Sequence, residues 1–360
     1  MVKQRFPALD IMRGLTLALM ILVNNPGSWS HVYAPLLHAD WHGFTPTDFI
    51  FPFFLFMVGA ALFFSQRSLM QPHITAGERH KKIIKRGVLL FAVGVFLNVF
   101  PFLAPVSEWR ILGVLQRIAL AYMFAAFIVL YAGAKLRWVI SACILLGYWW
   151  LLQLSSQPYT LEHSLVRQID IVVLGANHLW QGKGMAFDPE GLLSTLPAIV
   201  NVILGFEVAR VLSQGNSSSA ALMKLAAMSA LLIVAALVWN QFFPINKSLW
   251  TSPFVLLTSG VGIAVLLVLV LLEKTPVKSV LGFFTPFGKN PLFIYALAFI
   301  WSTLLYTFHI GDQSYYGFFY QQLCRLFDAY NASLVFALIH VLMFWCVAKY
   351  MDKKNIVISL

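Results

Sequence analysis

Apolar residues gather in long runs along this 360-residue chain, and short polar stretches separate the runs. About ten runs are long enough to cross the roughly 30 Å hydrocarbon layer of a bilayer as helices. The runs fall at residues 11–23, 49–64, 87–103, 111–131, 138–154, 192–212, 225–243, 253–272, 291–308 and 333–347. A half-length apolar piece at 280–287 predicts an eleventh segment, which either lies in the membrane interface or re-enters the membrane.

Helices are the structure that these runs predict. Backbone amides in lipid must be hydrogen-bonded within their own segment, and the runs lack the alternating apolar and polar positions of membrane strands. The composition agrees, because 60% hydrophobic and 11% charged residues lie outside the range of ordinary soluble domains. We therefore expect an all-α, polytopic transmembrane helical bundle that forms a single domain over residues 1–360.

The charges predict the sidedness of this bundle. If the N-terminus is cytoplasmic, most of the 25 lysines and arginines lie on the inner side, as the positive-inside rule requires. An even number of spans then places both termini in the cytoplasm. Most of the 14 acidic residues fall on the outer side, which also holds the longest outer loop, 155–191, and long loops often carry function.

The inner loop ERHKKIIKR, residues 78–86, is basic enough to bind a polyanion. The positive-inside bias and the headgroups of membrane lipids account for this charge, so we expect no nucleic-acid partner. The three cysteines indicate no disulfide framework, because Cys143 and Cys346 lie inside spans and Cys324 is left without a partner.

The polar stretch 24–59 is the most unusual part of the chain. It is rich in histidine, aspartate and asparagine and lacks lysine and arginine, although the net charge of the protein is +11. Asn24 ends the first span, where it either caps free carbonyls or orients a substrate carbonyl. His38 and His42 are spaced i, i+4, but no HExxH glutamate or nearby third ligand accompanies them, so we predict no metal site.

Thr45, Pro46, Thr47 and Asp48 form a helix start, with a hydroxyl cap, a proline in the first turn and an acid at the third position. Asp48 is therefore explicable as a cap. An acid at the positive end of a membrane helix, near histidines, can also fix the tautomer of an imidazole. Both interpretations of Asp48 stay open.

Further polar residues lie at the ends of later spans. Arg117 lies inside a span, where it either forms a salt bridge with Glu108 or another outer acid, or contacts an anion. Glu207 and Arg210 are one turn apart and are expected to pair, as are Asp10 and Arg13. The outer stretches FDPEGLLSTLP and FPINKSLWTSP add a last group of candidates, Asp188, Glu190, Asn246, Lys247 and Trp250.

Several motifs, taken in order, resemble one known family. They are LDIMRGLTLALMILVNN, HADWHGFTPTDFIFPFFLFMVG, ILGVLQRIALAY, FDPEGLLSTLPAIVNVILG, PINKSLWTSPFVLLTSG and TPFGKNPLFIY. Together they are similar to the transmembrane acyltransferase family of heparan-α-glucosaminide N-acetyltransferase, and most similar to its shorter bacterial members of the NagX type. The resemblance runs from about Leu9 to the last span. His42 is a departure from it, because asparagine is usual after this tryptophan.

The resemblance implies transfer of acetyl groups from cytosolic acetyl-CoA to the amine of glucosamine or of a terminal glucosaminyl residue on the far side of the membrane. Its catalytic histidine corresponds to His38, the asparagine at the end of the preceding helix to Asn24, and the aspartate that begins the second span to Asp48. The DPEG acids correspond to Asp188 and Glu190. It further implies a homodimer and a multi-pass protein of the bacterial inner membrane, surrounded by lipid.

The residue types suit this chemistry. A histidine can take the proton of an amine that attacks a thioester, or can carry the acetyl group itself. Asn24 and Lys247 would stabilise the oxyanion, and Asp188 and Glu190 would attract a glucosammonium. Asn246, Trp250 and Arg117 complete the expected substrate contacts. Basic residues of the inner side, Arg13, Lys82 and Arg86, would hold the phosphates of CoA.

Two other functions remain open from the sequence. One is a sugar transporter, with Arg117 and Glu207 as coupling charges, although no convincing internal repeat supports it. The other is an O-acetyltransferase of a periplasmic glycan, which shares the donor but acts on a hydroxyl group.

Overall fold

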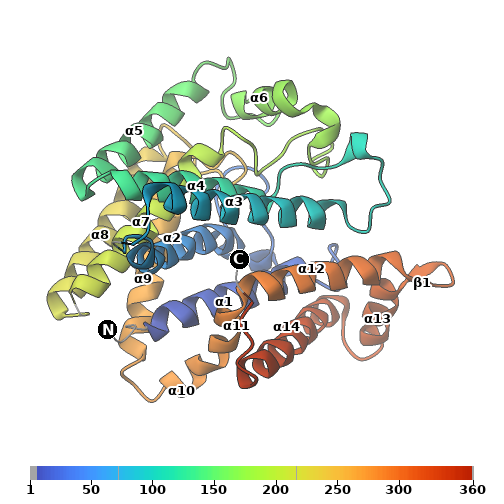
Figure 1. Ribbon diagram of the computed structural model, residues 1–360. Helices are drawn as coiled ribbons and strands as arrows, with labels where there is room; N and C mark the ends of the chain where they lie inside the picture. The colour runs from blue at the N-terminus through green and yellow to red at the C-terminus, as the bar shows by residue number, and fades with distance from the viewer. Residues whose placement is uncertain (1–5, 72, 216, 359–360) are drawn as a thin grey trace. The chain divides into compact units, whose positions relative to one another are not determined.

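The computed structural model describes residues 6–71, 73–215 and 217–358. Its described residues are mostly helical, and they form two compact units (Figure 1). Unit 1 comprises the described residues up to His38, Thr45–Ile50 and the described residues from Val268 on. Unit 2 comprises Ala39–Phe44 and the described residues of Phe51–Leu267.

Unit 1 contains three long helices, several short ones and a small hairpin. The elements are α1 (Pro7–Asn24), η1 (Ala34–Leu36), η2 (Pro46–Phe49), α10 (Lys278–Leu281), η5 (Gly282–Phe284), α11 (Thr285–Lys289), α12 (Pro291–Thr307), β1 (His309–Ile310), β2 (Gln313–Ser314), α13 (Tyr315–Cys324) and α14 (Ala329–Lys353). Strands β1 and β2 pair antiparallel, and Gly311 supplies the positive φ of 59° that their tight turn requires. Helices α12, α13 and α14 pack against one another (Figure 1).

Unit 2 contains most of the remaining long helices. Its elements are α2 (Ile50–Leu69), α3 (Ala76–Val99), η3 (Val106–Glu108), α4 (Val114–Tyr131), α5 (Ala134–Leu152), α6 (Leu165–Leu174), η4 (Ala176–His178), α7 (Thr195–Gln214), α8 (Ser219–Trp239) and α9 (Ser252–Leu272), which belongs to this unit up to Leu267. The predicted outer loop 155–191 is structured by α6 and η4. A buried cluster of Tyr148, Leu152, Val166, Phe187, Phe243 and Leu249 packs beneath it.

The expected all-α polytopic fold is confirmed, and a helix lies in each of the predicted spans. By length and composition, eight helices of the described chain can cross a membrane, or nine if one bent pair counts as a single span. The prediction of about ten therefore exceeds this number. Helix α3 falls short because its first half is highly charged. Helix α12 is short, and it follows a bend of 78° after the helical segment Lys278–Lys289.

That bend answers the question left by the half-length apolar piece at 280–287. The piece is helical and is joined to α12 at a sharp break, which is the geometry of a broken span or a re-entrant loop. The break falls at Asn290, a fully buried residue whose side chain donates to the carbonyl of Ile356 at 2.9 Å and accepts from the amide of Ile358 at 2.7 Å. The C-terminal tail is thereby fastened to the bend.

Helices α1 and α11 approach closely through glycine. A Cβ added to Gly14 would overlap the carbonyl oxygen of Phe284, and one added to Gly288 would overlap that of Asp10. Arg13 donates to the carbonyl of Gly288 at 3.0 Å and lies 3.6 Å from the carboxylate of Asp10, so the predicted pair of Asp10 and Arg13 is present. Small residues permit such approach between membrane helices, where close packing drives association.

In unit 2 the predicted pair of Glu207 and Arg210 is also confirmed, at 2.6 Å. A second arginine, Arg137 of α5, contacts the other oxygen of Glu207 at 2.6 Å. Glu207 is buried, so two cations compensate one buried carboxylate between α5 and α7.

Candidate active site

His38 and Asp48 form a hydrogen-bonded pair in unit 1. The Nδ1 atom of His38 lies 2.7 Å from Oδ1 of Asp48, and the side chain of His38 is 48% exposed whereas that of Asp48 is 1% exposed. A carboxylate accepts, so Nδ1 carries the hydrogen and Nε2 of a neutral imidazole carries the lone pair. A buried acid that orients a half-exposed histidine is the arrangement of a general base.

The helix start places Asp48 at this position. The predicted start is confirmed, although it begins as the 3₁₀ turn η2 before it continues as α2. Oδ2 of Asp48 accepts from the amide of Thr45 at 2.9 Å and from its hydroxyl at 3.2 Å, while Oδ1 faces His38. The hydroxyl of Thr45 also lies 2.6 Å from the carbonyl of Leu37, beside His38. Asp48 therefore caps the turn and also contacts the imidazole, so its position is compatible with both interpretations.

The two asparagines at the end of α1 have different surroundings. Asn25 is buried; it donates to the carbonyl of Ile21 at 2.7 Å and accepts from the hydroxyl of Ser302. Asn24 is exposed, and its side chain makes no hydrogen bond to any residue that the structure describes. Asn25 thus fixes the end of the helix, while the amide of Asn24 is available to a ligand.

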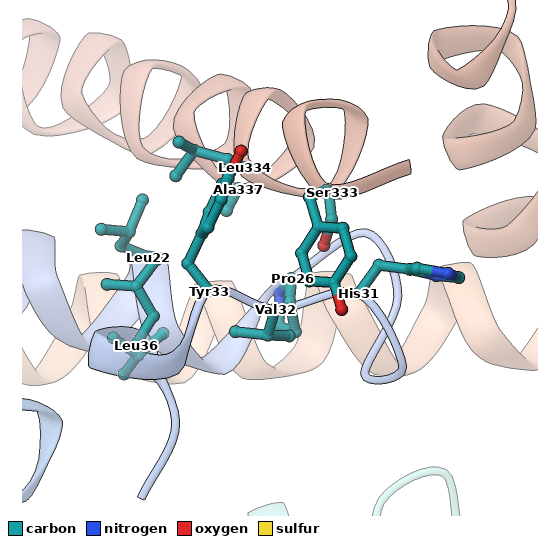
Figure 2. Close-up of a pocket in the computed structure, with 11 residues that line it drawn as sticks. Leu22, Pro26, His31, Val32, Tyr33, Leu36, Ser333, Leu334 and Ala337 are labelled. Atoms are coloured by element: carbon teal, nitrogen blue, oxygen red, sulfur yellow. The ribbon is translucent and has the colours of Figure 1, made fainter. Parts of the chain in front are cut away.

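The loop between α1 and His38 is fastened to α14. The amide of Gly27 donates to the carbonyl of Ser333 at 3.2 Å, and the hydroxyl of Tyr33 donates to Asn331 at 3.0 Å. Figure 2 shows the small pocket between this loop and α14, where Leu22, Val32 and Leu36 lie opposite Leu334 and Ala337. Its volume of about 10 Å³ has room for one water at most, so this pocket is packing beneath the loop rather than a substrate site.

Residues Ala39–Phe44, which follow His38, belong to unit 2. The indole of Trp41 donates to the carbonyl of Tyr159 at 2.7 Å, and the amide of Gly43 donates to that of Ile245 at 2.8 Å. Nδ1 of His42 accepts from the side chain of Asn246 at 3.3 Å, and burial lowers the pKa of His42 below its ordinary value. Among the described residues, no three side chains of the histidine, cysteine, aspartate and glutamate kinds gather as metal ligands.

Arg110 binds both acids of the DPEG turn. Its Nε and Nη2 contact the two oxygens of Asp188 at 2.8 Å each, and Nη2 also contacts Glu190 at 2.7 Å. Burial opposes the charge on Arg110, but the hydrogen bond to Asp188 and the charges of Glu190 and Asp188 outweigh it and raise the pKa of Arg110. Asp188 is fully buried and Glu190 nearly so. The single positive charge of Arg110 therefore balances one of the two negative charges in the turn.

Arg117 lies fully buried just beyond this turn. Its Nη2 donates to the hydroxyl of Ser194 and, at 3.4 Å, to the carbonyl of Gly191, and its guanidinium lies 4.6 Å from the centre of the Trp250 ring. Its Nε and Nη1 have no hydrogen-bond partner among the described residues. The alternative of a salt bridge to Glu108 is therefore wrong for Arg117.

Asp170 of α6 completes the polar cluster around the turn. It is fully buried; Oδ1 accepts from the amide of Leu192 at 2.9 Å, while Oδ2 has no partner among the described residues. Burial raises the pKa of Asp170 to about 7, against the effect of that hydrogen bond. The segment from Asp188 to Ser194 is thus bound by Arg110, Arg117 and Asp170.

Asn246 and Trp250, both predicted to touch substrate, are buried in unit 2. Asn246 accepts from the amide of Leu249 at 2.8 Å, so it shapes the turn, and the indole of Trp250 donates to Asn201 at 2.9 Å. Trp250 has a φ of 51°, a conformation that a bulky residue rarely adopts and that concentrates at functional sites. Lys247 between them is half-buried.

The predicted CoA contacts are divided between the units. Arg13 belongs to unit 1 and is engaged by Gly288, as described above. Lys82 and Arg86 lie one turn apart on α3 in unit 2, where Lys82 is exposed and Arg86 lies over the ring of Tyr122 at 4.9 Å. Lys82 thus presents its charge to the surroundings.

Sequence reasoning missed Arg110, Asp170 and Asn25. Arg110 lies 78 and 80 residues from its two partners, and Asp170 lies 22 residues from the amide it accepts from, so no local spacing marks either residue. Asn25 is adjacent to Asn24, and the direction in which each side chain points at a helix end decides their roles. A signal for Arg110 did exist, since it is one of few basic residues on the predicted outer side, which is rich in acids.

Comparison with known proteins adds the family. Residues 5–237 match the family described as Heparan-alpha-glucosaminide N-acetyltransferase, catalytic. The mouse heparan-alpha-glucosaminide N-acetyltransferase is 29% identical over 353 residues, which covers 81% of this chain and 53% of the mouse protein. The human protein of the same name is 28% identical, with 81% and 52% covered. The chain therefore spans about half the length of these curated relatives.

The family match takes in the pair of His38 and Asp48 and the whole of the cluster around Arg110. It covers well over half of the chain, and the two relatives agree with it. The chain belongs to the family of the heparan-alpha-glucosaminide N-acetyltransferase catalytic domain.

Proposed function

We propose that this protein is a membrane acetyltransferase that moves the acetyl group of cytosolic acetyl-CoA to the amine of glucosamine, or of a terminal glucosaminyl residue, on the periplasmic side of the inner membrane. The observation that carries the proposal is the hydrogen bond between His38 and buried Asp48. Membership of the family supports the reaction class. By the same resemblance, we expect the protein to act as a homodimer.

In this reaction the amine of the acceptor attacks the carbonyl carbon of the thioester, and the C–S bond breaks. The amine must lose a proton, and Nε2 of His38 takes it. Asp48 holds the opposite ring nitrogen and stabilises the imidazolium that forms. The proton then leaves His38 for the thiolate of CoA or for water, which returns the imidazole to its neutral form.

Asn24 is the proposed partner of the carbonyl oxygen, where its exposed amide stabilises the negative charge that develops. The proposed role of Asp188 and Glu190 changes in view of their contacts. Both carboxylates are bound by Arg110 and are largely buried, so they shape the turn before α7, and Arg110 acts with them as a positioning residue. Lys247 and Trp250 remain proposed substrate contacts. Arg13, Lys82 and Arg86 remain proposed contacts of the CoA phosphates.

The proposal is tested with purified protein in liposomes, acetyl-CoA labelled in the acetyl group, and three acceptors. Glucosamine has an amine, glucose has a hydroxyl at the same position, and N-acetylglucosamine has a blocked amine. We expect a labelled product when glucosamine is the acceptor, and none when glucose or N-acetylglucosamine is the acceptor. Transfer to glucose or to N-acetylglucosamine at a similar rate would favour the O-acetyltransferase, and accumulation of unmodified glucosamine without acetyl-CoA would favour the transporter.

Whether His38 is a base or an acetyl carrier is decided in the absence of acceptor. If His38 carries the acetyl group, the protein becomes labelled by acetyl-CoA, and the label disappears when glucosamine is added. A base leaves the protein unlabelled and requires both substrates to be bound at once.

A further inference from the structure

Side chains of helices α12, α13 and α14 line a partly open cavity of about 270 Å³ in unit 1. These three helices pack against one another in pairs (Figure 1). Almost all of its lining is apolar, and its lining residues include Trp301, Leu305, Phe319, Leu323, Phe336 and Ile339. At roughly 30 Å³ for each water-sized group, this space takes about nine non-hydrogen atoms.

One polar group in the lining lacks a partner. His340 is 5% exposed, and its Nε2 has no hydrogen bond to any residue that the structure describes. Its Nδ1 lies 2.9 Å from the carbonyl of Phe336. A carbonyl only accepts, so Nδ1 carries the hydrogen, and Nε2 of the neutral ring is an acceptor. A ligand that satisfies this atom must therefore offer a donor.

The neighbouring polar groups do not supply that donor. The ring centre of Tyr316 is 6.3 Å from that of His340, but its hydroxyl donates to the carbonyl of Pro26 at 2.8 Å. Gln322 also lines the cavity and makes no hydrogen bond to Nε2. The ring of Phe336 stands 4.6 Å from the imidazole and offers carbon only.

His340 lies near the middle of a long apolar helix. With a rise of about 1.5 Å per residue, it is ~17 Å from the start of α14 at Ala329 and ~20 Å from the end at Lys353. At that depth in a bilayer water is scarce, and an unpaired polar atom is costly, so such residues usually have a function. Trp301, Phe319 and Ile339 are 39%, 47% and 50% exposed at the rim, which leaves the cavity open to a molecule dissolved in the membrane.

We infer that this cavity binds a membrane-dissolved amphiphile with one apolar chain and one hydroxyl group, and that the hydroxyl donates to Nε2 of His340. The apolar walls bury the chain, and the single acceptor selects an O–H over an ether or ketone oxygen of equal size. A single short chain fits a cavity of about 270 Å³. This site is independent of the acetyl transfer proposed above, since it uses neither His38 nor Asp48.

Two photoreactive probes test the inference on the full chain in phosphatidylcholine nanodiscs. Both carry the same diazirine in the same alkyl chain; one ends in a hydroxyl and the other in a methyl ether. Labelled peptides are mapped by mass spectrometry. We expect the alcohol to label the peptides of α12, α13 and α14 at least fivefold more than the ether does. Unlabelled 1-octanol, which has about nine non-hydrogen atoms, should compete, whereas methyl heptyl ether of matched size should not.

The His340→Leu variant should reduce labelling by the alcohol to the level of the ether, because leucine keeps the apolar volume and removes the acceptor. Leu338→Ala is the matched control, since Leu338 lies two positions away on α14, is 49% exposed and does not line the cavity. Equal labelling of wild type by the two probes would overturn the inference, and this comparison needs no variant. Cross-linking of α14 to α14 between two copies, with no labelling by either probe, would overturn it as well.

Discussion

The imidazole of His38 owes its orientation to one carboxylate that lies ten residues later in the sequence. Oδ1 of Asp48 contacts the ring and Oδ2 caps the turn that begins α2, so one buried side chain serves the structure and, in the proposed reaction, the chemistry. This double use explains why the helix start and the proposed base occur within one motif.

Replacement of Asp48 by asparagine separates these two uses. An amide keeps an oxygen for the cap but cannot stabilise the imidazolium, so we expect kcat for acetyl transfer to fall by about 10²–10⁴-fold, with little change in KM for acetyl-CoA. Steady-state kinetics measure both constants. Asp40→Asn, an exposed acid of the same segment, should leave kcat unchanged. Equal effects of the two changes would show that Asp48 is only a cap.

The ion pairs of Arg110 with Asp188 and Glu190 are tested by their effect on the stability of the protein. The change Arg110→Gln leaves Asp188 and Glu190 without their cation in a buried place, and removing one partner of a buried ion pair costs about 3–5 kcal/mol. The free energy of unfolding in detergent, from a denaturant titration, measures this loss. Arg325→Gln is the control, because Arg325 is exposed and has no ion pair among the described residues. A similar small loss in both variants would contradict the stabilising role of the contacts between Arg110 and the two acids.

Asp170 should make stability depend on pH. Its pKa is about 7 in the folded protein and 3.8 for an ordinary aspartate, so between these values the folded state holds a proton that the unfolded state has lost. The free energy of unfolding therefore falls as pH rises from about 4 to about 7, and levels off above. The variant Asp170→Asn has no carboxyl group here, so its free energy of unfolding should not show this decrease with pH. Its Tm relative to wild type should rise between pH 5 and pH 8, and a constant difference would refute the assignment.

At the level of single residues, the sequence predicts local relations and misses distant ones. The cap at Asp48 and the pair of Glu207 and Arg210 follow from spacing within one helical turn, and both are present. The ion pair between Arg137 and Glu207 joins residues 70 positions apart, so no short sequence spacing predicts it. Spacing cannot reveal it because packing between helices brings the two together.

The elements owe their arrangement to the small residues at their contacts. Helix α1 approaches the short helix α11 so closely that Gly14 and Gly288 each face the backbone of the other helix. The broken segment before α12 is held in place by this contact and by the bonds of Asn290 to the C-terminal tail.

The variant Gly14→Ala tests the glycine contact. Its Cβ would overlap the carbonyl of Phe284 in η5, so α1 must separate from η5 and from α11, which follows it directly. Overpacking of this kind costs about 1–3 kcal/mol. We expect a lower Tm by fluorescence-detected unfolding. Gly147→Ala on α5 is the matched control, because a Cβ there meets no atom within 4 Å and alanine favours a helix by about 1 kcal/mol. An equal Tm for the two variants would contradict the close contact.

At this scale the apolar runs predict the helices well, because the length of each run is set by the bilayer. The ends are less certain. Helix α3 begins at Ala76, well before the apolar run at 87, since the charged residues of its first half are good helix formers and Thr75 and Glu78 form a capping box. The loop 155–191 contains α6, whose ten residues are too few for a span.

For the molecule as a whole, the distribution of charge predicts its orientation in the membrane, but only an experiment on sidedness can test it. In a background with Cys143, Cys324 and Cys346 changed to alanine, a membrane-impermeant thiol reagent should label Gln157→Cys in intact cells, and Lys224→Cys only after permeabilisation. Both residues are exposed, so access to the reagent depends on the side of the membrane. The reverse pattern would invert the orientation of every span.

In the proposed reaction, acetyl transfer depends on Nε2 of His38. The most direct measurement is the rate of labelled acetyl transfer from acetyl-CoA to glucosamine by the wild type, His38→Ala and His163→Ala in the same liposomes. His163 is the matched control, because its side chain is 48% exposed, as is that of His38, and it lies in the predicted outer loop. We predict a loss of at least about 10²-fold for His38→Ala and wild-type transfer for His163→Ala. Undiminished transfer by folded His38→Ala would exclude His38 as the base or acetyl carrier.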